Sequence, residues 1–497
     1  MSDTHDLGLM ISSRIPLVVV RSREEQRVLQ AVTRLGMRRD LGMYAWTVTD
    51  GVKGLGFGEA PRSDEHGRYE RPEAVLELIR HHTGKPSVFV LCDFHPYVDD
   101  PRIVRRIKDI ALSYRELGHT LVFLGHDFDL PAEWQGLAHN LTLRLPDDGQ
   151  LLAIVREEAS AWSRENAGER VRTDRATLDR LVANLRGVTA AEARRLVRGV
   201  IADDGAIREE QIAEVNAAKF ELLDMDGVLS FEYDTARFSD VAGLERLKEW
   251  LAHRQSAFLQ PSESVAEPLR GILLLGVQGS GKSLAAKAVA GMWHCPLLRL
   301  DMGALYNRFF GESEKNVREA LRLADMMAPC VLWVDEIEKG IGQDGSDGGT
   351  SQRVLGTLLT WMAERQSQVF VVATANDISQ LPPELIRKGR LDEIFFVDLP
   401  KPAIRAEIFR VHLERRGLDP ADFDLDRLAA ASDGFSGAEI EQLVVSGIYS
   451  SDANDRPTDT DAVLREVART SPLSVVMAER IEALRMWADG RAVPADD

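Results

Sequence analysis

The stretch Gly276-Val277-Gln278-Gly279-Ser280-Gly281-Lys282-Ser283 has the pattern G-x-x-x-x-G-K-S and directly follows the apolar run 272–275. A segment rich in Ala and Leu, residues 284–292, comes next. A strand, a glycine loop and a helix start are the context of a phosphate-binding loop, whose backbone N–H groups point at an anion. Lys282 can reach the β- and γ-phosphates, and Ser283 can ligate Mg²⁺. This context favours a nucleotide-binding loop over a chance glycine turn.

Two acidic residues end a second apolar run. Asp335 and Glu336 directly follow residues 331–334, and Asp335 lies 53 residues after Lys282. Asp335 is placed to hold the hydration shell of Mg²⁺, and Glu336 to orient or deprotonate an attacking water. Such pairs are also common on surfaces, but their distance from the glycine loop favours a catalytic role.

Three further polar residues follow in the same series. Asn376 comes after the apolar run 369–374, and the carboxyl end of a parallel strand faces the ligand crevice. It can hydrogen-bond the γ-phosphate or water, although an Asn there can also merely cap a turn. Arg387 and Arg390 can stabilise charge on a transferring phosphoryl group, and a neighbouring molecule can donate them. Two arginines in a loop are ordinarily only part of the solvated surface. Their position in the series, after Asn376, is what favours a functional role.

Composition limits the class of protein. The chain has 497 residues, 44% of them hydrophobic and 28% charged, which predicts several globular domains. The net charge of −18 argues against a large nucleic-acid surface. Cys92, Cys295 and Cys330 are widely spaced and indicate a reduced compartment. Because neither a membrane-length apolar run nor a signal peptide is evident, we expect no membrane span and a cytoplasmic location.

In this order, the glycine loop, acid pair, Asn and Arg pair resemble a classical-clade AAA ATPase module over about residues 239–480. Residues 238–244 (FSDVAGL) resemble the family's adenine-contacting entry segment, and residues 434–440 (GFSGAEI) its lid motif. The resemblance implies a parallel sheet sandwiched by helices, a helical lid and the cofactors ATP and Mg²⁺. The implied nucleotide-binding residues are Asp240, Val241, Ala242, Gly276, Gly279, Ser280, Gly281, Lys282, Ser283, Leu284 and Asp335, with Ser283 and Asp335 on Mg²⁺.

The same resemblance implies roles beyond binding. Asn376 would be the first sensor, and Arg387 and Arg390 would act on the ATP of a neighbouring subunit, so a homo-oligomer is expected, most often a hexameric ring. Phe309, Phe310 and Gly311 match the aromatic-hydrophobic-Gly step of the family's pore loop, which grips a polypeptide. Two core phenylalanines are the alternative. No H-E-x-x-H sequence is present, so the fused zinc protease of some relatives is not expected.

The whole chain further resembles a narrower group, the hypothetical chloroplast reading-frame AAA ATPases of cyanobacteria and plastids. Supporting segments are residues 276–283 (GVQGSGKS), 328–335 (APCVLWVD), 346–353 (SDGGTSQR), 381–400 and 90–96 (VLCDFHP). The resemblance leaves open whether the compartment is a bacterial cytoplasm or a plastid stroma. It does not identify a client.

The N-terminal half repeats the strand pattern of the ATPase half. Apolar runs end near Arg21, Asp93, Gly125 and, for a run at 141–145, Pro146, and residues 187–192 (GVTAAE) are similar to the lid motif. We therefore expect a degenerate AAA-like α/β domain. Residues 21–26 (RSREEQ) replace the glycine loop, and their two carboxylates would repel a triphosphate. The alternative is an ordinary alternating α/β domain.

The predicted domains are the degenerate α/β domain at 1–150, a helical lid-like segment at 151–202, a linker with a small helix at 203–238, the AAA core at 239–401, a helical lid at 402–480 and a C-terminal tail at 481–497, which is expected to be loosely ordered after about residue 488. The leading functional hypothesis is a Mg²⁺-dependent ATPase ring that remodels or threads an unidentified protein client. The alternatives are an ATP-controlled regulatory module that switches partners without threading, and a nucleic-acid motor, which the charge disfavours.

Overall fold

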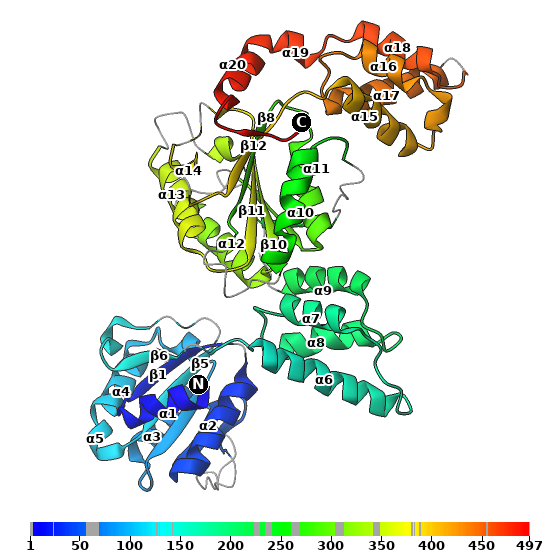
Figure 1. Ribbon diagram of the computed structural model, residues 1–497. Helices are drawn as coiled ribbons and strands as arrows, with labels where there is room; N and C mark the ends of the chain where they lie inside the picture. Colours follow the sequence, from blue (N-terminus) through cyan, green and yellow to red (C-terminus); the bar gives the residue numbers. More distant parts are fainter. Residues whose placement is uncertain are drawn as a thin grey trace. The chain divides into compact units, whose positions relative to one another are not determined.

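The computed structural model describes residues 3–22, 24–55, 69–125, 128, 130–141, 143–222, 229–233, 241–259, 269–303, 313–340, 348–378, 381, 383–386, 389–453 and 456–496. The chain divides into two compact units, Met1–Pro146 and Asp147–Asp497. Each unit has its own buried cores, so each is described by itself. Figure 1 shows their elements along the chain.

The first unit is built on a six-stranded sheet with the order β3-β2-β4-β5-β1-β6. All neighbouring strands are parallel except β3, which runs antiparallel to β2 at the edge. The central strands β1, β4 and β5 are rich in Val, Leu and Phe, as expected for strands covered on both faces. The strands are β1 (Leu17–Arg21), β2 (Gly42–Thr47), β3 (Gly51–Gly54), β4 (Ser87–Cys92), β5 (Thr120–Gly125) and β6 (Ala138–Leu141).

Helices cover both faces of this sheet. Alternate strand residues point to opposite faces, so Leu17 and Val19 join one core and Val18 and Val20 the other. The first core packs against α3 and α4, and the second against α1 and α2. The helices are α1 (Asp3–Ser12), α2 (Glu25–Arg39), α3 (Pro72–His81), α4 (Pro101–Leu112) and α5 (Tyr114–Leu117).

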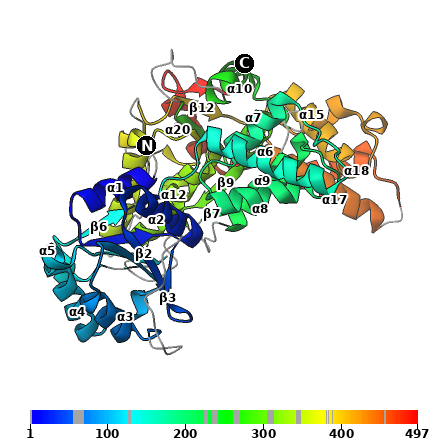
Figure 2. The same cartoon turned by 90° about the horizontal axis from the view of Figure 1, so that it is seen from below.

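The second unit begins with a domain of the four helices α6 to α9 (Figure 2), which has its own core rich in Leu, Val and Ile. Lys219, fully buried on α9, donates to the carbonyl of Asn184 at 3.0 Å and to that of Arg186. It thereby joins α9 to the end of α7. The helices are α6 (Asp148–Glu165), α7 (Arg175–Asn184), α8 (Ala190–Ile201) and α9 (Glu209–Leu222).

The ATPase-like sheet has the order β13-β12-β8-β11-β10-β9-β7. Its strands are parallel except β7, which is antiparallel to β9 at the edge. The strands are β7 (Leu229–Glu232), β8 (Gly271–Gly276), β9 (Leu297–Asp301), β10 (Cys330–Asp335), β11 (Val369–Ala375), β12 (Glu393–Val397) and β13 (Val493–Pro494).

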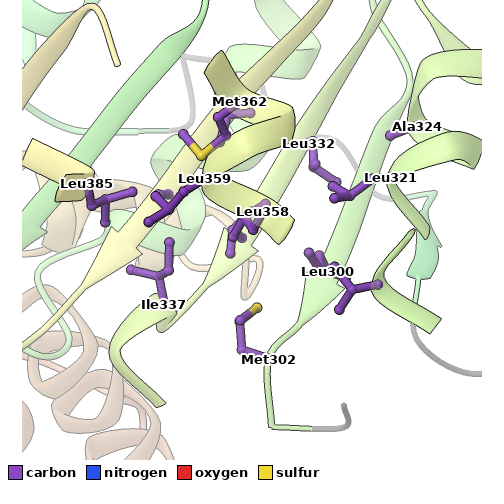
Figure 3. Packing of buried hydrophobic residues seen from close by; sticks show 14 of the residues in the cluster. Leu300, Met302, Leu321, Ala324, Leu332, Ile337, Leu358, Leu359, Met362 and Leu385 are labelled. Atoms are coloured by element: carbon purple, nitrogen blue, oxygen red, sulfur yellow. The ribbon is translucent and has the colours of Figure 1, made fainter. Parts of the chain in front are cut away.

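This sheet is also sandwiched by helices (Figure 1). Ile272 and Leu274 pack against α10 and α11, while Leu273 and Leu275 pack against α12 and α13. Figure 3 shows part of the second core, where Leu332 lies among Leu321, Leu358 and other side chains from these helices. The helices are α10 (Glu245–Leu259), α11 (Lys282–Trp293), α12 (Ser313–Met327), α13 (Gly348–Glu364) and α14 (Pro383–Ile386).

A second helical cluster follows β12 and has its core around Phe409, Leu443 and Val463. Its helix α17 begins with a capping box in which Ser436 and Glu439 exchange bonds with each other's backbone N–H groups. The elements are α15 (Pro402–Glu414), α16 (Leu425–Ala431), α17 (Gly437–Asp452), α18 (Thr460–Arg469), α19 (Leu473–Val476) and α20 (Ala478–Ala488).

Three sequence expectations need correction. The helix in the predicted linker 203–238 is α9, which belongs to the helical core through Ile212 and Val215, and the same segment also contains β7, which pairs with β9. The tail after about residue 488, predicted to be loosely ordered, contains β13. There Ala495 donates to Phe396 at 2.9 Å and is almost fully buried. The last strand of the first sheet is Ala138–Leu141, not 141–145.

None of the described helices is both long enough and apolar enough to cross a lipid bilayer.

Candidate functional site: a nucleotide cavity at the carboxyl edge of the second sheet

The glycine loop connects β8 to the first residue of α11. Gly279 and Gly281 both have positive φ, 75° and 99°, a conformation that glycine adopts at little cost. Lys282 begins the helix, and its Nζ folds back to donate to the carbonyls of Gly276 at 2.9 Å and Val277 at 2.8 Å. The loop therefore presents a helix N-terminus and a buried cation at one place.

Burial lowers the pKa of Lys282 to about 8, and the carboxylates of Glu338, Glu336 and Asp335 partly oppose that shift. A buried ammonium with only carbonyl acceptors is short of counter-charge. An anion bound in the loop would supply it. The electrostatics of Lys282 thus favour a phosphate ligand.

Asp335 is the last residue of β10, Glu336 follows it, and both are fixed by one threonine. Thr374 Oγ1, on β11, donates to Asp335 Oδ1 at 2.9 Å and accepts from the N–H of Glu336 at 3.0 Å. Glu336 has a positive φ of 46°, a sparsely populated conformation for a non-glycine residue. Because of this turn, Glu336 does not continue the direction of β10.

Asn376, directly after β11, hydrogen-bonds two glutamates that follow β10. Its Nδ2 donates to Glu336 Oε1 at 3.0 Å, and its backbone N–H donates to Glu338 Oε1 at 2.8 Å. Glu336 also forms an ion pair with Lys339. Desolvation raises the pKa of Glu338, which is almost fully buried. Asn376 therefore holds Glu336 in a defined place.

These groups surround one cavity of about 510 Å³, a size typical of small-molecule sites. The lid contributes directly, since Ala438 N–H donates to the Gly279 carbonyl at 3.1 Å. Eleven predicted site residues line the cavity, namely Val241, Ala242, Gly279, Ser280, Gly281, Lys282, Ser283, Leu284, Asp335, Glu336 and Asn376.

The other predicted site residues lie elsewhere. Gly276 is not in the lining and contributes only its carbonyl to Lys282. Arg390 does not line the cavity of its own chain and donates to the carbonyl of Glu384. The remaining predicted residues, Asp240, Phe309, Phe310, Gly311 and Arg387, are outside the described residues.

Sequence reasoning missed the contribution of α15. Ile408, Val411 and His412 line the cavity from this helix, with Arg415 just after it. Burial lowers the pKa of His412, whose Nδ1 lies 3.7 Å from Glu441 Oε1 on α17. The spacing of Ile408, Val411 and His412 is that of one helix face, and the sequence could have indicated this. Only the fold shows that this face of the helix meets the glycine loop.

The cavity fits ATP with Mg²⁺. Ser280 Oγ is buried and has no hydrogen-bond partner among the described residues, as expected for a group that faces a ligand. In the described part of the chain, no cluster of three His, Cys or carboxylate side chains could hold a metal by itself. Ser283 and Asp335 would hold Mg²⁺ together with the phosphates, and the ion would neutralise charge on their oxygens.

Comparison with known proteins gives the family. The chain is 34% identical to the uncharacterized AAA domain-containing protein ycf46 of Guillardia theta, over 98% of this chain and 95% of that protein. The chain belongs to the ycf46 family of AAA proteins. The ycf46 protein of Trieres chinensis is 32% identical over 98% of this chain and 97% of its own length.

Models of three domains match the chain in order. Residues 3–143 match the N-terminal domain of SpoVK-like AAA ATPases, and residues 149–226 match their second domain. Residues 272–399 match the ATPase family associated with various cellular activities. The cell division cycle protein 48 homolog of Archaeoglobus fulgidus is 36% identical over 43% of this chain and 30% of its own length. This member of the ycf46 family is therefore an ATPase with an α/β AAA module.

Proposed function

We propose that this chain is a Mg²⁺-dependent ATPase that works as a ring, most simply a hexamer, and remodels a protein client. The observation that carries the proposal is the convergence of Lys282, Asp335, Glu336 and Asn376 on one cavity under the lid. Lys282 and Ser283 hold the phosphates, and Glu336 takes a proton from the attacking water. A bacterial cytoplasm or plastid stroma is the proposed location.

Arg387 and Arg390 are the reason for proposing a ring. Arg390 does not reach the cavity of its own chain, although transfer of a phosphoryl group needs positive charge beyond Lys282. We assign Arg387 and Arg390 to the site of the next subunit. Phe309, Phe310 and Gly311 would grip the client in the channel of the ring, because aromatic rings pack against any polypeptide.

A mixing experiment tests the shared site. Arg390→Ala and Glu336→Gln should each abolish turnover when assayed alone. Mixed subunits should regain activity, because an intact Glu336 then meets an intact Arg390 across some interfaces. No recovery in mixtures shown to contain both variants in one oligomer would contradict the assignment.

The client is tested separately. Phe309→Ala should keep basal ATPase and lose unfolding of a tagged model substrate. Loss of nucleotide binding would instead identify Phe309 as a core residue. Wild-type protein with slow turnover that unfolds no tagged substrate would favour the alternative, an ATP-controlled module that switches partners.

A further inference from the structure

Arg299, on β9, contacts the carboxylate that we assign to Mg²⁺. Its Nη2 lies 2.9 Å from Asp335 Oδ2, while Thr374 Oγ1 donates to Asp335 Oδ1 at 2.9 Å. Each carboxylate oxygen thus accepts one bond from a neighbouring strand and keeps lone pairs for another donor. The rotamer of Asp335 is fixed from both sides, by β9 and by β11.

Arg299 is itself part of an alternating series of charges. Its Nη1 lies 3.9 Å from Glu232 Oε1 on β7, and Lys287 Nζ on α11 lies 3.0 Å from Glu232 Oε2. We call Lys287, Glu232, Arg299 and Asp335 the charge chain. The guanidinium also lies over the ring of Trp333, 4.8 Å from its centroid.

The side chains of the charge chain are partly shielded from water. Their exposed fractions are 25% for Lys287, 20% for Glu232, 35% for Arg299 and 17% for Asp335. Interactions between such groups are stronger than those of a fully solvated surface pair. Removal of one charge should therefore be felt by its neighbours.

One member of the charge chain lies on β7, the strand that follows the helical domain along the sequence. Glu232 belongs to β7, in which Ser230 pairs with Arg299 and Phe231 pairs with Leu298. Phe231 in turn contacts Phe220 of α9, with ring centroids 5.6 Å apart. A shift of α9 would move β7, and Glu232 with it, relative to Arg299.

We propose that Arg299 is a positioning residue for Asp335, and that Glu232 balances its charge. Arg299 holds the carboxylate so that its remaining lone pairs face the water shell of Mg²⁺. Glu232 offsets the guanidinium, which would otherwise repel the cation. This inference rests on the proposed function, since it assigns Asp335 to the metal.

Three variants, two at Arg299 and one at Glu232, separate the two roles. Arg299→Met should lower turnover about tenfold or more, the usual effect of losing a group that orients a metal ligand. Arg299→Lys should restore part of it, because the charge is kept. Glu232→Gln should raise the Mg²⁺ concentration for half-maximal binding of a fluorescent ATP analogue about tenfold. That binding is measured in the Glu336→Gln background, in which hydrolysis is not required.

Arg485→Met is the matched control. Arg485 pairs with Asp398 through three bonds of 2.9–3.1 Å, but neither residue lines the cavity. This variant should leave both measurements unchanged. ADP binding without Mg²⁺ should also be unchanged in Arg299→Met and Glu232→Gln, which shows that the nucleotide cavity is intact.

The inference is overturned if Arg299→Met and Glu232→Gln match Arg485→Met in turnover and in Mg²⁺ dependence. Wild-type ATPase activity would survive that result, so the proposed function would stand. Conversely, a wild-type protein without ATPase activity would contradict the proposed function. The binding titration would still decide the role of the charge chain, because it needs no turnover.

Discussion

The two sheets of this chain share the order of five parallel strands but differ in the residues at their carboxyl edges. Numbered along the chain, five parallel strands lie in the order fifth, first, fourth, third, second in both, as β6-β1-β5-β4-β2 and as β12-β8-β11-β10-β9, and β13 extends the second sheet beyond β12. Each sheet also carries an antiparallel strand at the same edge. The shared order supports the interpretation that the first unit is a degenerate copy of the second.

The difference lies at the carboxyl edges. In the second sheet, β8 ends at Gly276 and α11 begins at Lys282, which leaves room for a phosphate loop. In the first, β1 ends at Arg21 and α2 begins already at Glu25. Burial, together with Glu25 and Asp93, raises the pKa of the Cys92 thiol to about 12. Fold alone therefore does not make a nucleotide site; the loop length and the sign of its charge do.

The largest expected effect distinguishes two residues at matching positions. Glu336 follows β10 with φ 46°, and Asp93 follows β4 with φ 50°. Glu336→Gln should lower ATP turnover by about a hundredfold or more, because it removes the general base. Asp93→Asn should leave turnover within about twofold, since surface changes away from a site cost little. A steady-state phosphate-release assay decides, and equal losses would refute the comparison.

A smaller effect is expected where the loop meets the lid. A Cβ on Gly279 would lie 3.0 Å from Ser436 Oγ and 3.2 Å from the Ala438 Cβ, and φ there is 75°. Gly417 has a similar φ of 74° but open space around it. Both Gly→Ala changes should lower stability by about 1 kcal/mol, because a Cβ disfavours the left-handed conformation. Only Gly279→Ala should weaken nucleotide binding, measured by calorimetry. Equal affinities would show that the loop–lid contact is unimportant.

The smallest effect concerns pH. With a pKa of about 8, Lys282 is mostly protonated at pH 7 and mostly neutral at pH 9. Phosphates favour the protonated form, so ATP affinity should fall about tenfold between these values. Binding at pH 8 should take up roughly half a proton, measured by calorimetry in two buffers of different ionisation heat. Binding without proton uptake would show that Lys282 is already charged without nucleotide.

Much of the second unit could be predicted from sequence because its signals are local. The glycine loop, the acids at a strand end and the lid motif at 434–440 are each recognisable within a few residues. The family and the α/β AAA fold are confirmed. The roles of the arginines and of the pore loop stay predictions.

The misses have a common cause. The strand β13 is only Val493–Pro494, and α9 lies in an acidic segment, so neither has a strong pattern of its own. Arg299 and His412 are separated from Asp335 and the glycine loop by many residues. Only the folded sheet brings Arg299 to Asp335, and only the fold of the lid brings His412 to the cavity. Long-range placement of this kind leaves no local sequence signal.

The central claim, that one sheet of the two binds nucleotide, is tested most directly by counting ATP molecules bound per chain. Equilibrium dialysis of the Glu336→Gln variant with labelled ATP and Mg²⁺ should saturate at one ATP per chain. Adding Lys282→Ala should reduce that number to zero. Two ATP molecules per chain, or one that persists without Lys282, would contradict the account.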